Sequence, residues 1–253
     1  LARMALGVSS AMRRATAYQA TSSRIQRMLV DSGFEAGKVV LIANAVDIDR
    51  FQAAEPAAGR REALFGPRNL IGIYVGRLEW EKGVDLLLRG WARVLRGRDD
   101  ALLLLVGHGS LRGKLETLCV SLGIAPQVRF LGPSRQPEEY LALADFGLLT
   151  SMHEGLSNTL LEYMAAGLPV LGSRVSGNED FIVEERTGWL FPPGDEDAFV
   201  AALEAVCAST DDVLRAMREH ALAMVRARAS IERVGDRLLR LYGGDVGDPA
   251  RDL

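Results

Sequence analysis

Two glutamates stand eight positions apart in the stretch MHEGLSNTLLEYMAAGLP, residues 152–169. Ser157 or Asn158 can cap a helix that begins here, which places Glu162 in its second turn. On one continuous helix, residues eight apart differ by roughly 80° and do not share a face. We therefore expect Glu154 in the loop before the helix. There, both carboxylates can accept hydrogen bonds from vicinal hydroxyls of the kind that sugars and riboses present.

Simpler interpretations of the two acids exist. Glu154 could complement the helix dipole, and Glu162 could be an exposed helical residue. Glu162, however, lies in a largely apolar helix, next to Leu161 and close to Met164. A charge in that setting is hard to explain without a partner, which favours a functional role.

Two cations stand in the segment GRLEWEKG, residues 76–83. The guanidinium of Arg77 offers a planar fork for phosphate oxygens, and the ammonium of Lys82 adds a compact charge, so the pair suits a diphosphate. The alternative is a surface loop in which these cations pair with Glu79 or Glu81. Taken alone, the segment favours that alternative.

Apolar runs alternate with amphipathic segments along the chain and must position these side chains. Strands are predicted at residues 70–76, 101–107, 127–132, 145–151, 169–173 and 188–193, and helices at 84–96, 111–122, 138–144, 158–166, 178–185, 195–208 and from 211 onward. Continuous apolar strands in β-then-α order predict a Rossmann-like, doubly wound α/β domain with a parallel sheet.

Ligands of such sheets bind beyond the carboxyl ends of the strands. The loops at that edge are predicted at residues 76–83, 107–110, 132–137, 151–158 and 173–180, where glycine, serine and charge concentrate. Both glutamates and both cations belong to this edge or to the helix that follows it.

Composition excludes several classes of protein. The chain has 253 residues, of which 48% are hydrophobic, and a net charge of −3, so nucleic-acid binding is not expected. Cys119 and Cys207 show no disulfide or metal spacing, which favours a reduced, cytoplasmic setting. No apolar run reaches the roughly 18 to 20 residues that span a bilayer, and no signal peptide is visible.

Other cofactor motifs fail on inspection. A dinucleotide-binding glycine pattern that begins at Gly107 would need glycine where Arg112 stands. Gly113-Lys114 is followed by Leu115, so no Walker loop is present. The histidines do not cluster with carboxylates at metal-ligand spacing, and we predict no metal site and no cofactor other than the substrate.

The two ends of the chain differ from the middle. Residues 1–37 are expected to be the end of another domain and a linker, with a strand followed by a helix, and residues 243–253 a disordered tail. Before Asp31 there are five arginines and no acid: Arg3, Arg13, Arg14, Arg24 and Arg27. We favour a solvated helix face, while peripheral contact with the inner face of a membrane remains the alternative.

Taken together, the loops resemble a known family. VGRLEWEKGVDLLL, LLLVGHGSLRGKLE, ADFGLLTSMHEGLSNTLLEYMAAGLPVLGS and TGWLFPPGD follow one another at natural spacing. They resemble the C-terminal, donor-binding domain of GT-B fold retaining glycosyltransferases of family 4, over residues 38–242. The resemblance implies one GT-B half that binds a nucleotide-diphosphate sugar, followed by C-terminal helices.

The resemblance also implies roles for individual residues. Arg77 and Lys82 would hold the diphosphate, and Glu154 would contact hydroxyls of the transferred sugar; these three are the expected catalytic residues. Glu162 would accept hydrogen bonds from the ribose. The remaining donor contacts would come from the backbone around Gly76, Gly107, Phe130, Leu131, Gly132, Gly155, Leu156 and Ser157.

The resemblance further implies a hexosyltransferase that uses a UDP-, GDP- or ADP-sugar without a metal, with a glycan or lipid-linked acceptor bound by an N-terminal domain that this chain lacks. The isolated chain is then expected to be inactive. One alternative is a stand-alone nucleotide-sugar module. Another is a glycosidase that uses Glu154 and Glu162 as its carboxylate pair, which would leave Arg77 and Lys82 without a role.

Overall fold

A six-stranded parallel sheet forms the centre of the computed structural model, which describes residues 15–54, 59–67 and 69–243. The strand order is β5-β4-β3-β6-β7-β8. The strands are β3 (Leu70–Val75), β4 (Ala101–Val106), β5 (Val128–Gly132), β6 (Phe146–Leu149), β7 (Val170–Ser173) and β8 (Gly188–Phe191). The order reverses between β3 and β6, so the crevice beyond these two strands is where a ligand is expected.

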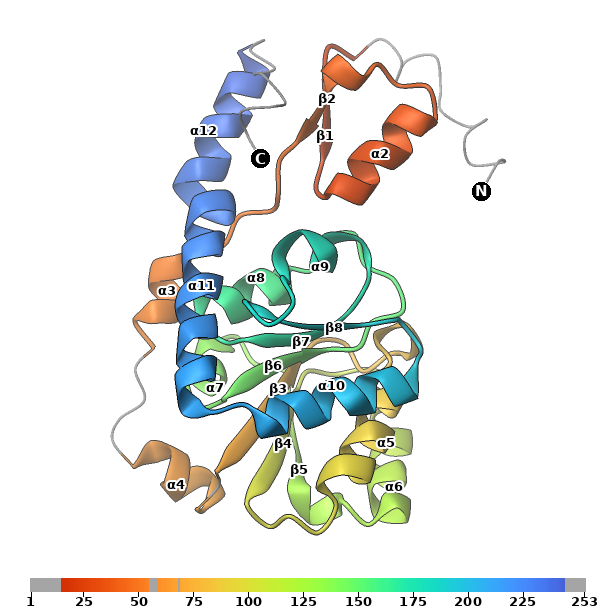
Figure 1. Ribbon diagram of the computed structural model, residues 1–253, viewed down its shortest axis with the longest axis vertical. Helices are drawn as coiled ribbons and strands as arrows, with labels where there is room; N and C mark the ends of the chain where they lie inside the picture. Colours follow the sequence, from red (N-terminus) through yellow and green to blue (C-terminus); the bar gives the residue numbers. More distant parts are fainter. Residues whose placement is uncertain (1–14, 55–58, 68, 244–253) are drawn as a thin grey trace.

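Helices follow the strands and cover both faces of the sheet (Figure 1). They are α3 (Ile48–Gln52), α4 (Arg60–Phe65), α5 (Val84–Leu95), α6 (Arg112–Leu122), α7 (Glu138–Leu141), α8 (Asn158–Ala165), α9 (Ser176–Phe181), α10 (Glu196–Ala208), α11 (Asp211–Ala229) and α12 (Ile231–Tyr242), with short 3-10 turns η2 (Ala36–Lys38), η3 (Trp80–Lys82) and η4 (Ala125–Gln127).

Each face of the sheet carries its own apolar core. Ile71 and Ile73 of β3 pack with residues of α3, α8 and α11, whereas Leu103 and Leu105 of β4 pack with residues of α5, α6 and α10. Because successive side chains of a strand point to opposite faces, a strand covered on both sides must be apolar throughout. The doubly wound α/β fold predicted from the continuous apolar strands is therefore confirmed.

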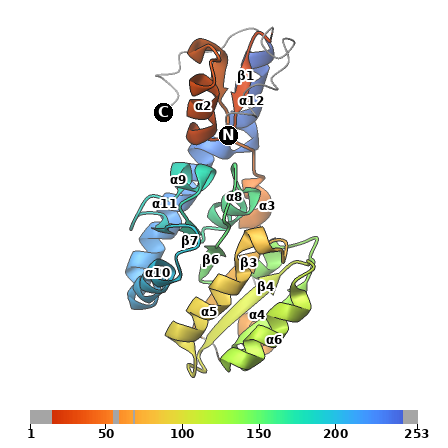
Figure 2. The ribbon, with the colours of Figure 1, turned by 90° about the vertical axis from the view of Figure 1, so that its right-hand side faces the viewer.

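A second, smaller unit precedes the main sheet. Strands β1 (Tyr18–Ala20) and β2 (Val39–Leu41) pair in parallel, and helix α2 (Ser23–Asp31) connects them. Figure 2 shows this unit next to α9 and at the opposite end of the molecule from α5 and α6. The strand and helix expected before residue 37 are present. The proposed domain boundaries remain predictions, and residues 244–253 of the predicted tail lie outside the described residues.

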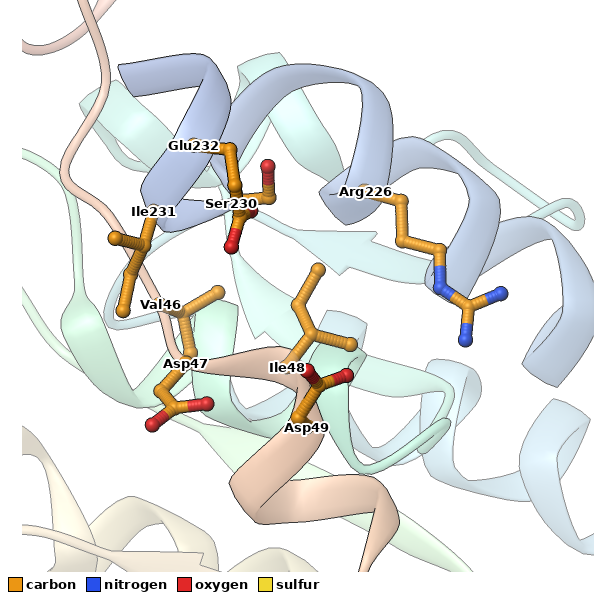
Figure 3. A pocket seen from close by; sticks show the side chains of 8 residues that line it. All are labelled: Val46, Asp47, Ile48, Asp49, Arg226, Ser230, Ile231 and Glu232. Carbon is orange, nitrogen blue, oxygen red and sulfur yellow. The ribbon is translucent and has the colours of Figure 1, made fainter. Parts of the chain in front are cut away.

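The chain crosses between the two units twice, at one place. The chain first passes from β2 of the smaller unit to α3 of the main domain. It returns between α11 and α12, and α12 lies beside β1 and β2 (Figure 1). The Val46 amide donates to the Ala229 carbonyl at 2.9 Å, and Val46 forms a parallel bridge with Ser230. Figure 3 shows side chains of both passages around a pocket of about 270 Å³ that they line together.

Two helices end more than one residue before their predicted limits, α7 at Leu141 instead of residue 144 and α9 at Phe181. The sequence suggested a helix over residues 178–185, but α9 spans Ser176–Phe181. The Thr187 hydroxyl explains the early end, because it accepts from the Val183 amide and donates to the Phe181 carbonyl. A side chain that bonds the backbone in this way competes with the helical ladder. The acidic pair after Val183 therefore lies in a turn.

Candidate functional site

The loops after β3, β4 and β5 are joined by backbone hydrogen bonds. The Gly76 amide donates to Val106 at 2.9 Å, and the Gly107 amide donates to Gly132 at 2.8 Å. Gly107 has φ +146°, and a Cβ there would lie 1.8 Å from the Gly76 carbonyl oxygen. Gly76 and Gly107 therefore let two loops approach each other, as the edge of a ligand crevice requires.

A second set of contacts joins the β3 loop to the loop after β6. The Thr150 hydroxyl donates to the Lys82 carbonyl at 2.8 Å, and the Met152 amide donates to the Glu81 carbonyl at 2.8 Å. Gly83 has φ +62°, and a Cβ there would lie 2.3 Å from the Thr150 carbonyl oxygen. These contacts bring Lys82 against the segment that contains Glu154.

Lys82 and Glu154 form an ion pair at the point where the two loops meet. The ammonium donates to Glu154 Oε1, and the Ser151 hydroxyl donates to the same oxygen at 2.9 Å. The two side chains are only 19% and 16% exposed. Two of the residues predicted to hold different parts of the donor therefore contact each other. Ser151, which the sequence had not singled out, orients the carboxylate.

Arg77 lies in a more open position. Its guanidinium pairs with Glu81 at 2.8 Å, and its side chain is 62% exposed. The pairing with Glu81 that the sequence offered as the simpler alternative is therefore present. Trp80, between them in the chain, is 68% exposed. The predicted diphosphate cations thus have different settings, since Lys82 is half-buried in a pair and Arg77 reaches into solvent.

The loop after β6 passes beside α9 before α8 begins. Ser157 occupies the N-cap position of α8, but its side chain caps no amide. Asn158 does not cap either, because its Oδ1 accepts from the Asn44 amide at 2.7 Å. The capping prediction is therefore wrong in its side-chain detail. Gly155 instead accepts from the Gly177 amide through its carbonyl, and Leu156 and Ser157 are buried.

Glu162 lies in a different cluster from Glu154. Its neighbours there are Arg50 of α3 and Glu138 of α7, which form a two-pronged ion pair at 3.0 and 2.8 Å. Burial raises the pKa of Glu162, Arg50 lowers it and Glu138 raises it further. Within the described residues, no hydrogen bond or ion pair satisfies the Glu162 carboxylate. The sequence did not reveal Arg50 and Glu138 as its neighbours.

Phe130, Leu131 and Gly132 form the end of β5, and among the donor contacts that the resemblance implies, their backbone would meet the base. The Arg112 guanidinium lies over the Phe130 ring at 5.8 Å from its centroid, a cation–π contact. Leu131 packs against the sheet core, and Gly132 has φ +77°. Arg112, noted in the sequence only because it breaks a glycine pattern, therefore lies next to the predicted base site.

An open pocket of about 400 Å³ lies next to the Lys82–Glu154 pair. Residues 152–155, which include Glu154, form part of its wall. Helix α2, the loop after β7 and Pro193 after β8 supply the rest. The pocket therefore extends from the predicted sugar-binding carboxylate toward the N-terminal unit.

Among residues 15–54, 59–67 and 69–243, no three His, Cys, Asp or Glu side chains gather in a way that could hold a metal ion. No helix within the described ranges is long and apolar enough to cross a bilayer.

Comparison with known families decides the class of the chain. The family model described as "Glycosyl transferases group 1" matches residues 69–209, which is more than half of the chain. The chain belongs to this family. Its parallel sheet with flanking helices is accordingly that of one half of a GT-B glycosyltransferase.

Several relatives and solved structures are similar to this group 1 chain. A D-inositol 3-phosphate glycosyltransferase of Geodermatophilus obscurus is 32% identical over 85% of the chain, and one of Corynebacterium urealyticum is 32% identical over 84%. The chain spans about half the length of these relatives, 50% and 53%.

The solved structures agree in fold. The crystal structure of Anabaena HepE in complex with UDP superposes with a TM-score of 0.81 at 19% identity, over 90% of this chain and 64% of that one. Sucrose-phosphate synthase from Thermosynechococcus elongatus gives a TM-score of 0.80 at 27% identity, over 91% of this chain and 58% of that one.

Proposed function

We propose that this chain is the donor-binding part of a retaining glycosyltransferase that transfers a sugar from a nucleotide-diphosphate sugar to an acceptor. The observation that carries the proposal is the Lys82–Glu154 ion pair with Ser151, at the sheet edge where the strand order reverses. A cation for phosphate and a carboxylate for sugar hydroxyls are thereby held side by side. Anabaena HepE, which has a similar fold, has been crystallised with UDP and with UDP-glucose.

The proposed roles follow the geometry of the two clusters. Lys82 and Arg77 bind the diphosphate and stabilise the negative charge that develops on it as the sugar departs. Glu154, released from Lys82 when the phosphates arrive, accepts hydrogen bonds from the transferred sugar. Glu162 accepts from the ribose hydroxyls, which supply the donors that its carboxylate lacks. The backbone of Phe130, Leu131 and Gly132 meets the base.

Retention is part of the proposal and requires no nucleophile from the protein. A phosphate oxygen of the departing diphosphate takes the proton of the acceptor hydroxyl, which attacks from the same face of the sugar. Positive charge that develops at the anomeric carbon lies near the Glu154 carboxylate in this arrangement. Lys82 and Arg77 stabilise the negative charge of the departing diphosphate, which a metal ion does in other enzymes that act on phosphates. The reaction is therefore proposed to be metal-independent.

The setting of the enzyme is likewise proposed. A glycan or lipid-linked acceptor would bind through an N-terminal domain, at the cytoplasmic side of a membrane, and the isolated chain would bind donor without transferring sugar. The alternative is a stand-alone nucleotide-sugar-binding module. These two differ in one measurable respect, because only the first transfers sugar when an acceptor domain is supplied.

Thermal unfolding in the presence of nucleotides tests the donor site directly. UDP, GDP, ADP and their sugars are added separately to the chain. One of these nucleotides, or its sugar conjugate, is expected to raise the free energy of unfolding by roughly 2.7 kcal/mol at 100 times its dissociation constant. The double variant Arg77→Ala/Lys82→Ala should lose this gain.

The matched control is Lys38→Ala/Arg215→Ala, which removes the same charges from surface pairs with Glu35 and Asp212. It should keep the full stabilisation. If no nucleotide stabilises the chain, or if the double variant at the site responds as the wild type does, the donor site is not where we place it.

A further inference from the structure

The pocket beside Glu154 has two kinds of wall. Helix α2 lines it with Arg24 and Met28, the loop after β6 with Met152 and Glu154, and the loop after β7 with Arg174 and Ser176. Apolar side chains make up much of the lining, and two arginines, one from α2 and one from the loop after β7, complete it. Neither arginine belongs to the predicted donor site.

Within the described residues, the two arginines form only long ion pairs. Arg24 approaches Glu179 only to 4.0 Å, and Arg174 approaches Glu184 only to 3.9 Å. Apart from one longer contact of Arg218, the other described ion pairs join nitrogen and oxygen at 3.2 Å or less. Both guanidinium groups are about half exposed or more, so their donors remain available to a ligand.

The acid in the same pocket does not cancel this charge. Glu154 is already paired with Lys82. The pocket thus presents two arginines against one carboxylate that Lys82 neutralises, and the arginines still outnumber this carboxylate if a donor separates the pair. The pocket between the two chain passages has the opposite charge balance. It is lined by one arginine, Arg226, and by three acids: Asp47, Asp49 and Glu232 (Figure 3).

The N-terminal unit is fixed in place next to this pocket. The Ser22 and Ser176 hydroxyls form a hydrogen bond of 2.7 Å, and the Ser23 amide donates to Asp180 at 2.7 Å. These contacts attach the start of α2 to α9. Arg24, one residue further along α2, is therefore held on the same side of the pocket as Ser176.

We infer that this pocket binds a phosphate monoester group of the acceptor between Arg24 and Arg174, with the body of the acceptor along the apolar wall. The inference rests on the proposed glycosyltransferase function. A phosphate monoester carries close to two negative charges near neutral pH and offers three acceptor oxygens, which two guanidinium forks can match. An acceptor held in this way would have its remaining hydroxyls beside Glu154, where the transferred sugar is proposed to lie.

The test uses glycerol 1-phosphate as a soluble phosphate monoester, titrated into the full chain by calorimetry with and without saturating UDP. Arg24→Gln and Arg174→Gln are each expected to weaken its binding about ten-fold or more, the loss typical of one charge-assisted contact. Arg226→Gln, which removes the same charge from the other pocket, should leave binding unchanged. All three variants should bind UDP as the wild type does, because none of these arginines belongs to the donor site.

The outcomes separate this inference from the proposed function. If a nucleotide binds but neither glycerol 1-phosphate nor phosphatidic acid does, or if all three variants bind the phosphate monoester equally, the phosphate site is wrong while the donor site stands. If none of UDP, GDP and ADP binds, the proposed function is wrong, and the titration without nucleotide still tests the pocket.

A second arm identifies the source of the phosphate. The chain is sedimented with vesicles of phosphatidylcholine alone or with phosphatidic acid added, a lipid with a phosphate monoester headgroup. Arginine-dependent binding only to the vesicles that contain phosphatidic acid would assign a lipid acceptor. Arginine-dependent binding of glycerol 1-phosphate without vesicle binding would assign a soluble one. Binding to neither probe would contradict the inference.

Discussion

Glu154 and Glu162 lie within one loop-and-helix segment and yet have opposite electrostatic settings. Glu154 accepts hydrogen bonds from Lys82 and Ser151 on the same oxygen. Glu162 is half-buried near an Arg50–Glu138 pair that is already complete, and burial raises its pKa. Under the proposed function, Glu154 gives up a partner when a donor binds, whereas Glu162 gains its first hydrogen bonds.

The comparison has a general lesson for binding sites. A side chain that is paired before binding contributes only the difference between its old and new partners. A half-buried carboxylate without donors destabilises the free protein, and a ligand that supplies hydroxyls removes that cost. Loss of the Lys82–Glu154 pair should therefore lower the free energy of unfolding, whereas neutralisation of Glu162 should raise it. Both changes should weaken nucleotide binding.

Removal of Lys82 should give the largest effect. Lys82→Ala leaves Glu154 without its cation in a mostly buried position, so we expect the free energy of unfolding to fall by about 1 to 3 kcal/mol. Nucleotide affinity should fall roughly 30- to 100-fold, because a charged contact to phosphate is lost. Urea unfolding and calorimetric titration measure the two effects. An unchanged nucleotide affinity would show that the ion pair is structural only.

Glu162→Gln should give a smaller loss of affinity and a gain in stability. The amide keeps the shape but cannot ionise, so ribonucleotides should bind about ten-fold more weakly and the preference for them over deoxyribonucleotides should shrink. The free chain should become more stable near neutral pH. Equal discrimination in variant and wild type would remove Glu162 from the ribose site.

The pH dependence of the same variant sharpens the comparison. Because burial raises the folded-state pKa of Glu162, the folded carboxyl keeps its proton in a range where the unfolded one has lost it. Its contribution to the free energy of unfolding therefore falls as the pH rises from the ordinary glutamate pKa through the raised value. Glu162→Gln lacks this fall. The stability difference between variant and wild type should be larger at about pH 7 than at about pH 4.

Arg77→Ala should give the smallest effect on the folded chain. The Arg77–Glu81 pair is solvent-exposed, so stability should change by less than about 1 kcal/mol. Nucleotide affinity should fall roughly five- to ten-fold, and the loss should shrink at high salt, since an exposed charge is screened. Titration at low and high ionic strength tests this. A larger loss than that of Lys82→Ala would reverse the ranking of the two cations.

The sequence was sufficient to predict most of the fold. Continuous apolar strands such as residues 101–107 can be stable only when both faces are covered, so the parallel sheet and its helices followed from local pattern. The glycines of the edge loops were equally visible, although their close contacts with neighbouring loops were not. The end of α9 was missed because it depends on Thr187, a residue beyond the helix.

The candidate site was only partly predictable, because its contacts join distant parts of the chain. Lys82 and Glu154 are 72 positions apart and meet because β3 and β6 are neighbours in the sheet. Local pattern does not determine that strand order. The same limitation applies to Arg50 near Glu162 and to Arg24 at the pocket beside Glu154. Residue types were therefore predicted better than their partners.

Trp80 gives the donor edge an optical signal of its own. The chain has three tryptophans, and the other two, Trp91 and Trp189, are buried in the sheet core. Trp80 is 68% exposed and immediately precedes Glu81 and Lys82, in a loop hydrogen-bonded to the segment before Glu154. Acrylamide should therefore quench the long-wavelength part of the emission selectively. Any rearrangement of the Lys82–Glu154 pair can then be followed in the unlabelled wild-type protein.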